Sequence, residues 1–234
     1  MLVATYNIHR GRPPAGLFHP ERIERVIAEI HPDLIALQEA QHYFRRGTGM
    51  LDARRLEREL GLRPLHVTNR AGEQGWRSNV LLARREAMIL HGPVGLRLGG
   101  WEPRGAVLVE LDLGPGPLRV VATHLSLGAR RRELQAAALL EAIGRREPMP
   151  TLLLGDLNEW RRGKSALGVL ERVFGDPPHP PSFPSFFPRL ALDRILADPP
   201  ALVPRVEVHD TPLARRASDH LPLKAVLAEK SLGE

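Results

Sequence analysis

Short apolar runs alternate with amphipathic and turn-rich segments along the whole chain. Runs of consecutive or alternating apolar residues, bounded by Gly, Pro and Asp, are typical of short strands. They predict strands at residues 2–8, 34–37, 80–83, 87–90, 106–113, 118–123, 151–154, 190–196, 203–208 and 221–227.

Four segments have the spacing of apolar residues expected of helices. Pro20 begins the first, in which Ile23, Val26, Ile27 and Ile30 recur with a helical period before residues 31–33 end it. The other three span residues 51–60, 129–143 and 165–173, and Gly61 is expected to end the first of these.

The order of these elements indicates a single α/β domain over residues 1–234. No repeat of fixed period and no flexible linker divides the chain. A turn at residues 114–117 joins two strands of the β-rich middle, and helices lie toward both ends. We therefore expect two packed β-sheets flanked by helices.

Composition removes several classes of protein. The 234 residues are 43% hydrophobic and 26% charged, which is typical of a globular domain. No apolar run approaches the roughly 18 residues of a membrane span. The absence of cysteine excludes disulfides, thiolate metal sites and cysteine nucleophiles.

The formal charge is 33 − 27 = +6, and all but three of the cationic residues are arginine. A basic surface suits polyanions such as nucleic acid, phospholipid headgroups or phosphorylated metabolites. Arginine in place of lysine is equally explained by the codon bias of a GC-rich genome. Met1 is followed directly by a predicted strand, with no signal peptide between them, so we expect a cytoplasmic protein.

Polar residues with phosphate or metal chemistry stand where the predicted strands begin or end. These residues are Asn7, His9, Gln38, Glu39, Thr123, His124, Asp156, Asn158, Asp193, Asp219 and His220. Buried carboxylates and imidazoles are costly to desolvate without partners. If these ends converge, their oxygen atoms suit Mg²⁺ or Mn²⁺, whereas the clustered histidine spacing of a zinc site is missing.

The same residues fall within short motifs that occur in a fixed order. These motifs are Thr5-Tyr6-Asn7-Ile8-His9, Leu37-Gln38-Glu39, Ser78-Asn79-Val80, Arg104-Gly105-Ala106, Thr123-His124-Leu125, Gly155-Asp156-Leu157-Asn158, Leu192-Asp193-Arg194-Ile195 and Ser218-Asp219-His220. Their order resembles the endonuclease/exonuclease/phosphatase superfamily, which has the DNase I-like fold. That resemblance implies a four-layer α-β-β-α sandwich.

The resemblance also implies an Mg²⁺- or Mn²⁺-dependent hydrolase that cleaves a phosphate ester by in-line attack of water. Glu39 matches the principal metal ligand, with Asn7 beside it and Asp219 as a second carboxylate on the metal side. Asp156 matches the residue that orients or deprotonates the attacking water. Asn158 matches a hydrogen-bond donor to a phosphoryl oxygen and a partner of the neighbouring carboxylate.

The remaining matches concern proton transfer and substrate binding. His220 is expected to pair with Asp193, and His124 matches the other histidine of the site. Either histidine could protonate the leaving group. The expected substrate-binding residues are His9, Asn79, Arg104 and Arg130; the last lies in a run of arginines that could equally be solvated.

The substrate stays open, because the superfamily acts on DNA, RNA, phospholipids and small phosphoesters. The positive net charge slightly favours nucleic acid as the substrate. We also expect a monomer. Peripheral contact with lipid is an alternative to nucleic-acid binding. Phe183, Phe186 and Phe187 could stack on bases or enter a lipid interface, although we expect them to pack beneath their own loop. The same three interpretations apply to Trp76, Trp101 and Trp160. A non-catalytic nucleic-acid-binding module explains the charge but not the carboxylates.

Overall fold

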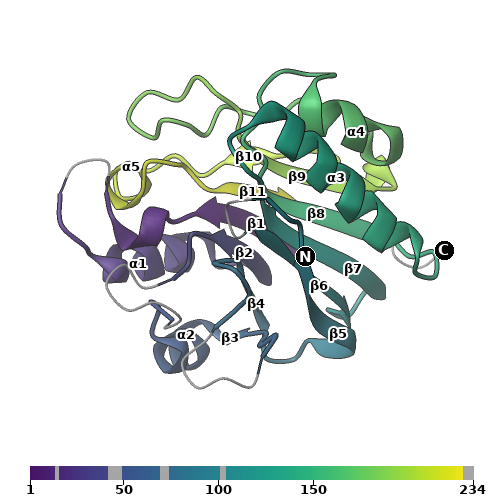
Figure 1. Ribbon diagram of the computed structural model, residues 1–234. Helices are drawn as coiled ribbons and strands as arrows, with labels where there is room; N and C mark the ends of the chain where they lie inside the picture. Colours follow the sequence, from purple (N-terminus) through teal and green to yellow (C-terminus); the bar gives the residue numbers. More distant parts are fainter. Residues whose placement is uncertain (14–15, 42–48, 69–73, 101–103, 229–234) are drawn as a thin grey trace.

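The computed structural model describes residues 1–13, 16–41, 49–68, 74–100 and 104–228 (Figure 1). Its strands are β1 (Leu2–Asn7), β2 (Leu34–Gln38), β3 (Leu62–Pro64), β4 (Val80–Arg84), β5 (Met88–Arg97), β6 (Gly105–Asp112), β7 (Pro117–His124), β8 (Thr151–Asp156), β9 (Asp193–Asp198), β10 (Glu207–Val208) and β11 (Leu223–Val226). Its α-helices are α1 (Pro20–Ile30), α2 (Ala53–Leu60), α3 (Ala129–Gly144), α4 (Ser165–Phe174) and α5 (Ala214–Ala217).

The strands form two mixed sheets. One has six strands in the order β10-β11-β1-β2-β4-β3, and the other has five in the order β5-β6-β7-β8-β9. Within them β1 runs parallel to β2 and β7 runs parallel to β8. These two parallel pairs need crossover connections, which α1 and α3 provide.

Alternation along the strands divides the apolar side chains among three buried layers. In β8, Leu152 and Leu154 face the layer between the two sheets, whereas Leu153 faces α3 and α4. In β2, Leu34 and Ala36 face the same central layer, whereas Ile35 and Leu37 are directed toward α1 and α2. Helices therefore cover the outer face of each sheet, which is the four-layer arrangement expected (Figure 1).

Local sequence signals set several helix ends. Asp52 caps the N-terminus of α2, since its carboxylate accepts from the backbone N–H of Arg55 at 3.0 Å. Gly61 ends the same helix with φ of 67°, as expected, because a left-handed residue closes the last turn without strain only when it is glycine. Within the described residues, no helix combines the length and apolar character needed to cross a membrane.

The structure differs from the sequence expectations mainly in irregular regions. The strand expected at 203–208 pairs only at Glu207–Val208, because Pro204 cannot donate a ladder hydrogen bond. The strand expected at 190–196 begins at Asp193, and the one expected at 221–227 begins after Pro222. The short elements β3 and α5 were not expected, since so few residues leave no period to detect.

Candidate active site

The ends of three adjacent strands bring carboxylates and a histidine side by side. His124 ends β7, Asp156 ends β8 and Asp193 begins β9. Asp156 is the register partner of His124 on one side and of Asp193 on the other. The pairing of the strands thus places three chemically active side chains at one edge of the five-stranded sheet.

Asp156 lies at the centre of this group and is almost fully buried. Its Oδ2 accepts from Nδ2 of Asn7 at 2.9 Å, and its Oδ1 accepts from the backbone N–H of Asn158 at 2.9 Å. The same Oδ2 lies 3.5 Å from Nε2 of His124 and 3.8 Å from Nε2 of His220. The carboxylate is therefore held by two hydrogen bonds while two imidazoles face it.

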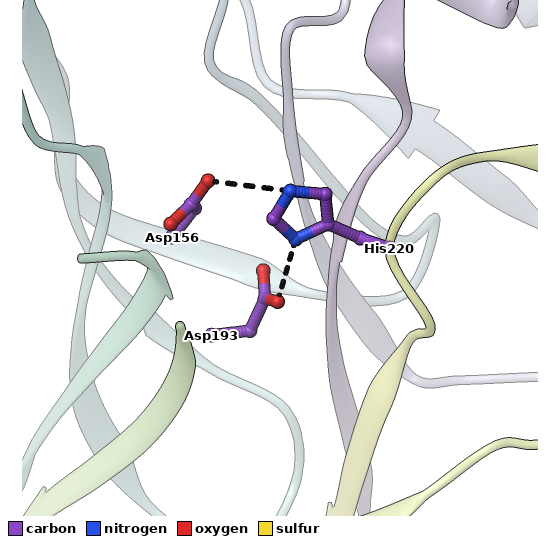
Figure 2. Close-up of side chains that lie close together, drawn as sticks. All are labelled: Asp156, Asp193 and His220. Atoms are coloured by element: carbon purple, nitrogen blue, oxygen red, sulfur yellow. Dashed lines mark hydrogen bonds and ion pairs between the residues drawn. The ribbon is translucent and has the colours of Figure 1, made fainter. Parts of the chain in front are cut away.

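His220 and Asp193 form the buried pair that the sequence led us to expect (Figure 2). Nδ1 of His220 donates to Oδ2 of Asp193 at 2.8 Å, and Ser182 Oγ donates to the same oxygen at 2.5 Å. Burial disfavours the charged imidazolium, but Asp193, Asp156 and Asp219 outweigh it and raise the pKa of His220 to about 10. His220 is therefore a cation at neutral pH, with its Nε2–H directed toward Asp156.

His124 has the opposite protonation state. Burial and the positive charges of Arg104 and His220 outweigh Asp156 and lower the pKa of His124 to about 4. Arg104 Nη1 lies 2.7 Å from Nδ1 of His124, and since a guanidinium only donates, this ring nitrogen accepts. The site thus contains one charged and one neutral imidazole.

The Gly155–Asn158 motif depends on backbone conformations that most residues avoid. Gly155 has φ of +148°, and a Cβ there would lie 1.9 Å from the carbonyl oxygen of Thr123, so only glycine fits beside β7. Asn158 and Glu39 also have positive φ, at 52° and 54°. Left-handed backbone is unfavourable for glutamate, and strain of this kind concentrates at functional sites.

The residues expected on the metal side come from three other segments. Glu39 follows β2 and is partly exposed, and Arg10 Nε lies 3.9 Å from its Oε2. Asp219 precedes β11, with Nδ1 of His9 at 3.6 Å from its Oδ1. Oδ1 of Asn7 accepts from the backbone N–H of His9 at 3.1 Å.

A second group could also hold a metal ion. Among the described residues, one potential ligand atom from each of Asp156, Asp193 and His220 lies within 4.8 Å of the other two. In this structure, however, His220 is charged, so its ring would have to lose a proton before it could bind a metal ion.

These side chains open into one cavity of about 530 Å³. The expected site residues on its lining are Asn7, Glu39, Arg104, His124, Asp156, Asn158 and His220. Phe183 also lines it and packs against the ring of His220, with 4.8 Å between ring centroids.

Other expected residues lie outside that lining. Asp193 is buried behind His220, whereas Asp219 and His9 lie next to each other nearby. Asn79 is buried, and its side chain donates to the backbone carbonyl of Gly105 at 3.0 Å. Arg130 is exposed on α3. Substrate contacts by His9, Asn79 and Arg130 stay predictions.

The expectation that the loop phenylalanines pack beneath their loop is wrong for two of them. Phe186 and Phe187 are 65% and 55% exposed, and Arg189 covers only the ring of Phe187, with its guanidinium carbon 4.3 Å from the ring centroid. Trp160 is 47% exposed and lines the cavity, whereas Trp76 donates to the carbonyl of Leu96. Trp101 lies outside the described residues.

The bond expected between Asn158 and Asp156 is made by the backbone of Asn158, not by its amide side chain. Nδ2 of Asn158 instead donates to the carbonyl of Leu125 at 2.9 Å and lies 3.1 Å from Nε2 of His124. The side chain therefore fixes the segment after β7 relative to the segment after β8.

Sequence reasoning missed two groups of residues near the site. Ser182, the second donor to Asp193, lies in a Pro-rich loop that gave no signal. Arg132 and Glu159 form a buried ion pair at 2.8 Å beside the cavity. A signal for the pair existed, since Glu159 directly follows the Gly155–Asn158 motif and Arg132 belongs to the arginine run.

Comparison with known proteins agrees with this geometry. The profile of the Endonuclease/Exonuclease/phosphatase family matches residues 4–220. No protein with a curated description matches the chain by sequence.

Several solved structures share the fold. An endonuclease/exonuclease/phosphatase from Bacteroides vulgatus is 18% identical with a TM-score of 0.73, covering 97% of this chain and 98% of its own. TDP2 from D. rerio, complexed with single-strand DNA product, is 14% identical with a TM-score of 0.67 over 97% of this chain and 98% of its own.

A third similar structure is a mannosyl-6-phosphatase from Bacteroides thetaiotaomicron. It is 18% identical with a TM-score of 0.66, covering 97% of this chain and 99% of its own. The match of the family profile to nearly the whole chain, together with the convergence of its motifs on one cavity, shows that this protein belongs to the endonuclease/exonuclease/phosphatase family.

Proposed function

We propose that this protein is a divalent-metal-dependent phosphoesterase that hydrolyses phosphodiester or phosphomonoester bonds, with nucleic acid as the favoured substrate. The observation that supports this most is the grouping in one cavity of a buried carboxylate, a charged imidazole and a neutral imidazole. Hydrolysis of a phosphate ester needs a group that orients water, donors for the phosphoryl oxygens and a proton for the leaving group.

The residues divide these tasks by position and charge. Asp156, fixed by Asn7 and the backbone of Asn158, orients the attacking water and accepts its proton. His220 presents a charged Nε2–H to a phosphoryl oxygen, and its link to Asp193 fixes the ring. The neutral ring of His124 accepts from Arg104 at Nδ1, and which of the two histidines protonates the leaving group stays open.

The chemistry of the oxygen donors fits a hard cation. Glu39, Asn7 and Asp219 would hold Mg²⁺ or Mn²⁺, which favours carboxylate and amide oxygens. The contacts of Glu39 with Arg10 and of Asp219 with His9, at 3.9 and 3.6 Å, are too long to be hydrogen bonds and leave lone pairs available. Such a cation, when bound, supplies Lewis-acid stabilisation of negative charge on the phosphoryl group.

A binding measurement separates this metal site from the alternative at Asp156, Asp193 and His220. Titration of Mn²⁺, followed by calorimetry, should show weaker binding in Glu39→Ala and little change in His220→Ala. Weaker binding in His220→Ala with none in Glu39→Ala would move the ion to the alternative group.

Activity is tested on a mixed panel of plasmid DNA, single-stranded DNA, RNA, a phospholipid and bis-p-nitrophenyl phosphate, with Mg²⁺, Mn²⁺ or EDTA. We expect turnover that requires metal and prefers nucleic acid. Asp156→Asn should lower it by roughly 100-fold or more, as loss of a general base does. Asp198→Asn, at the far end of the neighbouring strand β9, is the matched control.

Two results would overturn the proposal. Wild-type turnover in Asp156→Asn, with folding confirmed by circular dichroism, would remove the assigned chemistry. Nucleic-acid binding that survives EDTA without turnover of any substrate would favour a non-catalytic binding module instead.

A further inference from the structure

The cavity extends beyond the residues that handle the reacting phosphate. Arg132 from the first turn of α3, together with Trp160 and Arg161 from the segment after β8, also lines it. Leu127, an exposed residue before α3, completes this part of the lining. None of these four residues belongs to the motifs that define the family resemblance.

Two arginines share a single buried carboxylate in this part of the cavity. Glu159 is fully buried and accepts from Nη2 of Arg132 at 2.8 Å. It also accepts from Nε and Nη2 of Arg161 at 2.9 and 3.0 Å. Burial opposes ionisation, but hydrogen bonds from Arg161 and Arg132 lower the pKa of Glu159 to about 2. The trio therefore has a net charge of +1 at neutral pH.

The two arginines differ in exposure. The side chain of Arg132 is 4% exposed, and its buried Nε has no hydrogen-bond partner among the residues that the structure describes. The side chain of Arg161 is 50% exposed, so its guanidinium meets both Glu159 and solvent. An ion pair that served only to neutralise Glu159 would need one arginine, and the second places a surplus cation at the cavity.

This cationic group is fixed relative to the catalytic residues. Arg132 donates through Nη1 to the backbone carbonyls of Ser126 and Leu127, in the segment that follows His124. Glu159 directly follows Asn158, which contacts His124. An anion bound here would therefore lie at a defined distance from the reacting phosphate, and little ordering would be needed on binding.

An aromatic surface lies next to the positive charge. The ring of Trp160 is 47% exposed, and the guanidinium carbon of Arg161 lies 5.3 Å from its centroid. Exposed indole rings stack on nucleobases, and guanidinium groups bind phosphate with two parallel hydrogen bonds. The combination matches a nucleoside that bears a phosphate in addition to the one being cleaved.

We propose that Arg132, Arg161 and Trp160 form a subsite for a second phosphate on the nucleoside whose other phosphate is hydrolysed. This inference rests on the proposed function, because it assigns the substrate class of the same cavity. The second phosphate could be the next phosphate of a polynucleotide or the free phosphate of a nucleoside bisphosphate.

A matched pair of chromogenic substrates tests the subsite. Thymidine 5′-(p-nitrophenyl phosphate) and the same compound with an added 3′-phosphate share one scissile bond and one leaving group. In wild type we expect kcat/KM to be roughly 10- to 100-fold higher for the 3′-phosphorylated compound, the range of a hydrogen bond to a charged group. Arg161→Gln should remove most of that preference.

Arg162→Gln is the control, since Arg162 is equally cationic and pairs with Asp176 outside the cavity. It should keep the wild-type preference. A short oligothymidylate separates the two sources, because a polynucleotide subsite favours it over the bisphosphate compound and a small-molecule subsite does not.

A binding readout keeps the subsite testable apart from turnover. Thymidine 3′,5′-bisphosphate should quench tryptophan fluorescence at a lower concentration than thymidine 5′-phosphate, and Arg161→Gln should abolish that difference. Equal affinities in wild type, or an unchanged preference in Arg161→Gln, would overturn the subsite. Absence of metal-dependent turnover together with a retained binding preference would instead reject the proposed function alone.

Discussion

Replacing Asp193 with Asn is expected to change the pH at which this protein is active, in addition to its rate. The carboxylate of Asp193 lies 2.8 Å from Nδ1 of the buried His220 and is the main reason that this ring is charged. Asn at the same position keeps a similar shape and can still accept a hydrogen bond through its oxygen, but it removes the negative charge.

The structure sets the size of the effect. Relative to the ordinary value of 6.5, a pKa of about 10 corresponds to a shift of about 3.5 units, or about 5 kcal/mol, in favour of the imidazolium. His124 shows what happens with weaker compensation: it is equally buried, its nearest carboxylate is 3.5 Å away, and its pKa is about 4. Without Asp193, His220 approaches that situation, so we expect its pKa to fall by at least about 2 units.

The assay is kcat on bis-p-nitrophenyl phosphate between pH 5.5 and 9.5, with an NMR titration of the His220 ring. Wild type should keep a charged His220 throughout neutral pH. In Asp193→Asn the rate at pH 8 should fall at least about twofold, because a fall of at least about 2 units from a pKa of about 10 leaves no more than half of His220 charged there. It should recover partly as the pH is lowered, whereas Asp198→Asn should retain the wild-type profile.

One pattern of results would refute the reasoning. If His220 of Asp193→Asn still carries its proton at pH 8, the neighbouring carboxylates are not what holds the charge. A loss of activity that is equal at every pH, with the fold intact, would likewise show that His220 does not act through its charge.

Three further predictions concern stability. Gly155→Ala should destabilise the fold by several kcal/mol, measured by urea unfolding, because a Cβ cannot fit 1.9 Å from the carbonyl oxygen of Thr123; a change below about 1 kcal/mol would contradict this. His124 and His179 each have a pKa of about 4, so between pH 6.5 and 4 these side chains bind protons in the unfolded chain but not in the folded one. The free energy of unfolding should therefore fall as the pH is lowered through that window, by up to about 3 kcal/mol per residue. Thermal melts that show no change of stability over this window would argue against two buried neutral histidines. Leu153→Ala, between β8 and the α3–α4 layer, should cost about 2–5 kcal/mol in the same urea experiment, and a cost near zero would show that this layer is loosely packed.

The regular elements could be read from the sequence because their signals are local. The helix beginning at Pro20 and the strand ending at Asp156 each follow from the spacing of apolar residues over a few turns or a few alternations. Elements of three or four residues, such as β3 and α5, depend on neighbours supplied by the rest of the fold, and they are too short to show a period in the sequence.

The candidate residues were also visible, because the motif order of the family survives in a single chain. The residues that pair with them could be predicted only in part. The pairing of His220 with Asp193 was implied by resemblance, but Ser182 reaches Asp193 from a loop that no sequence pattern marks. Glu159 stands next to a motif, yet only the fold shows that it pairs with Arg132.

The sequence by itself determined the alternation of strands and helices, the identity of the polar residues at the strand ends and the net positive charge. Tertiary structure alone decided which of them meet and in what protonation state. His124 and His220 are the same residue type and both are buried, yet one is neutral and the other charged. The difference arises because burial lowers the pKa of both rings, whereas the register of β8 and β9 and the loop before β11 place carboxylates around His220. Arg104 and the charged His220 oppose protonation of His124.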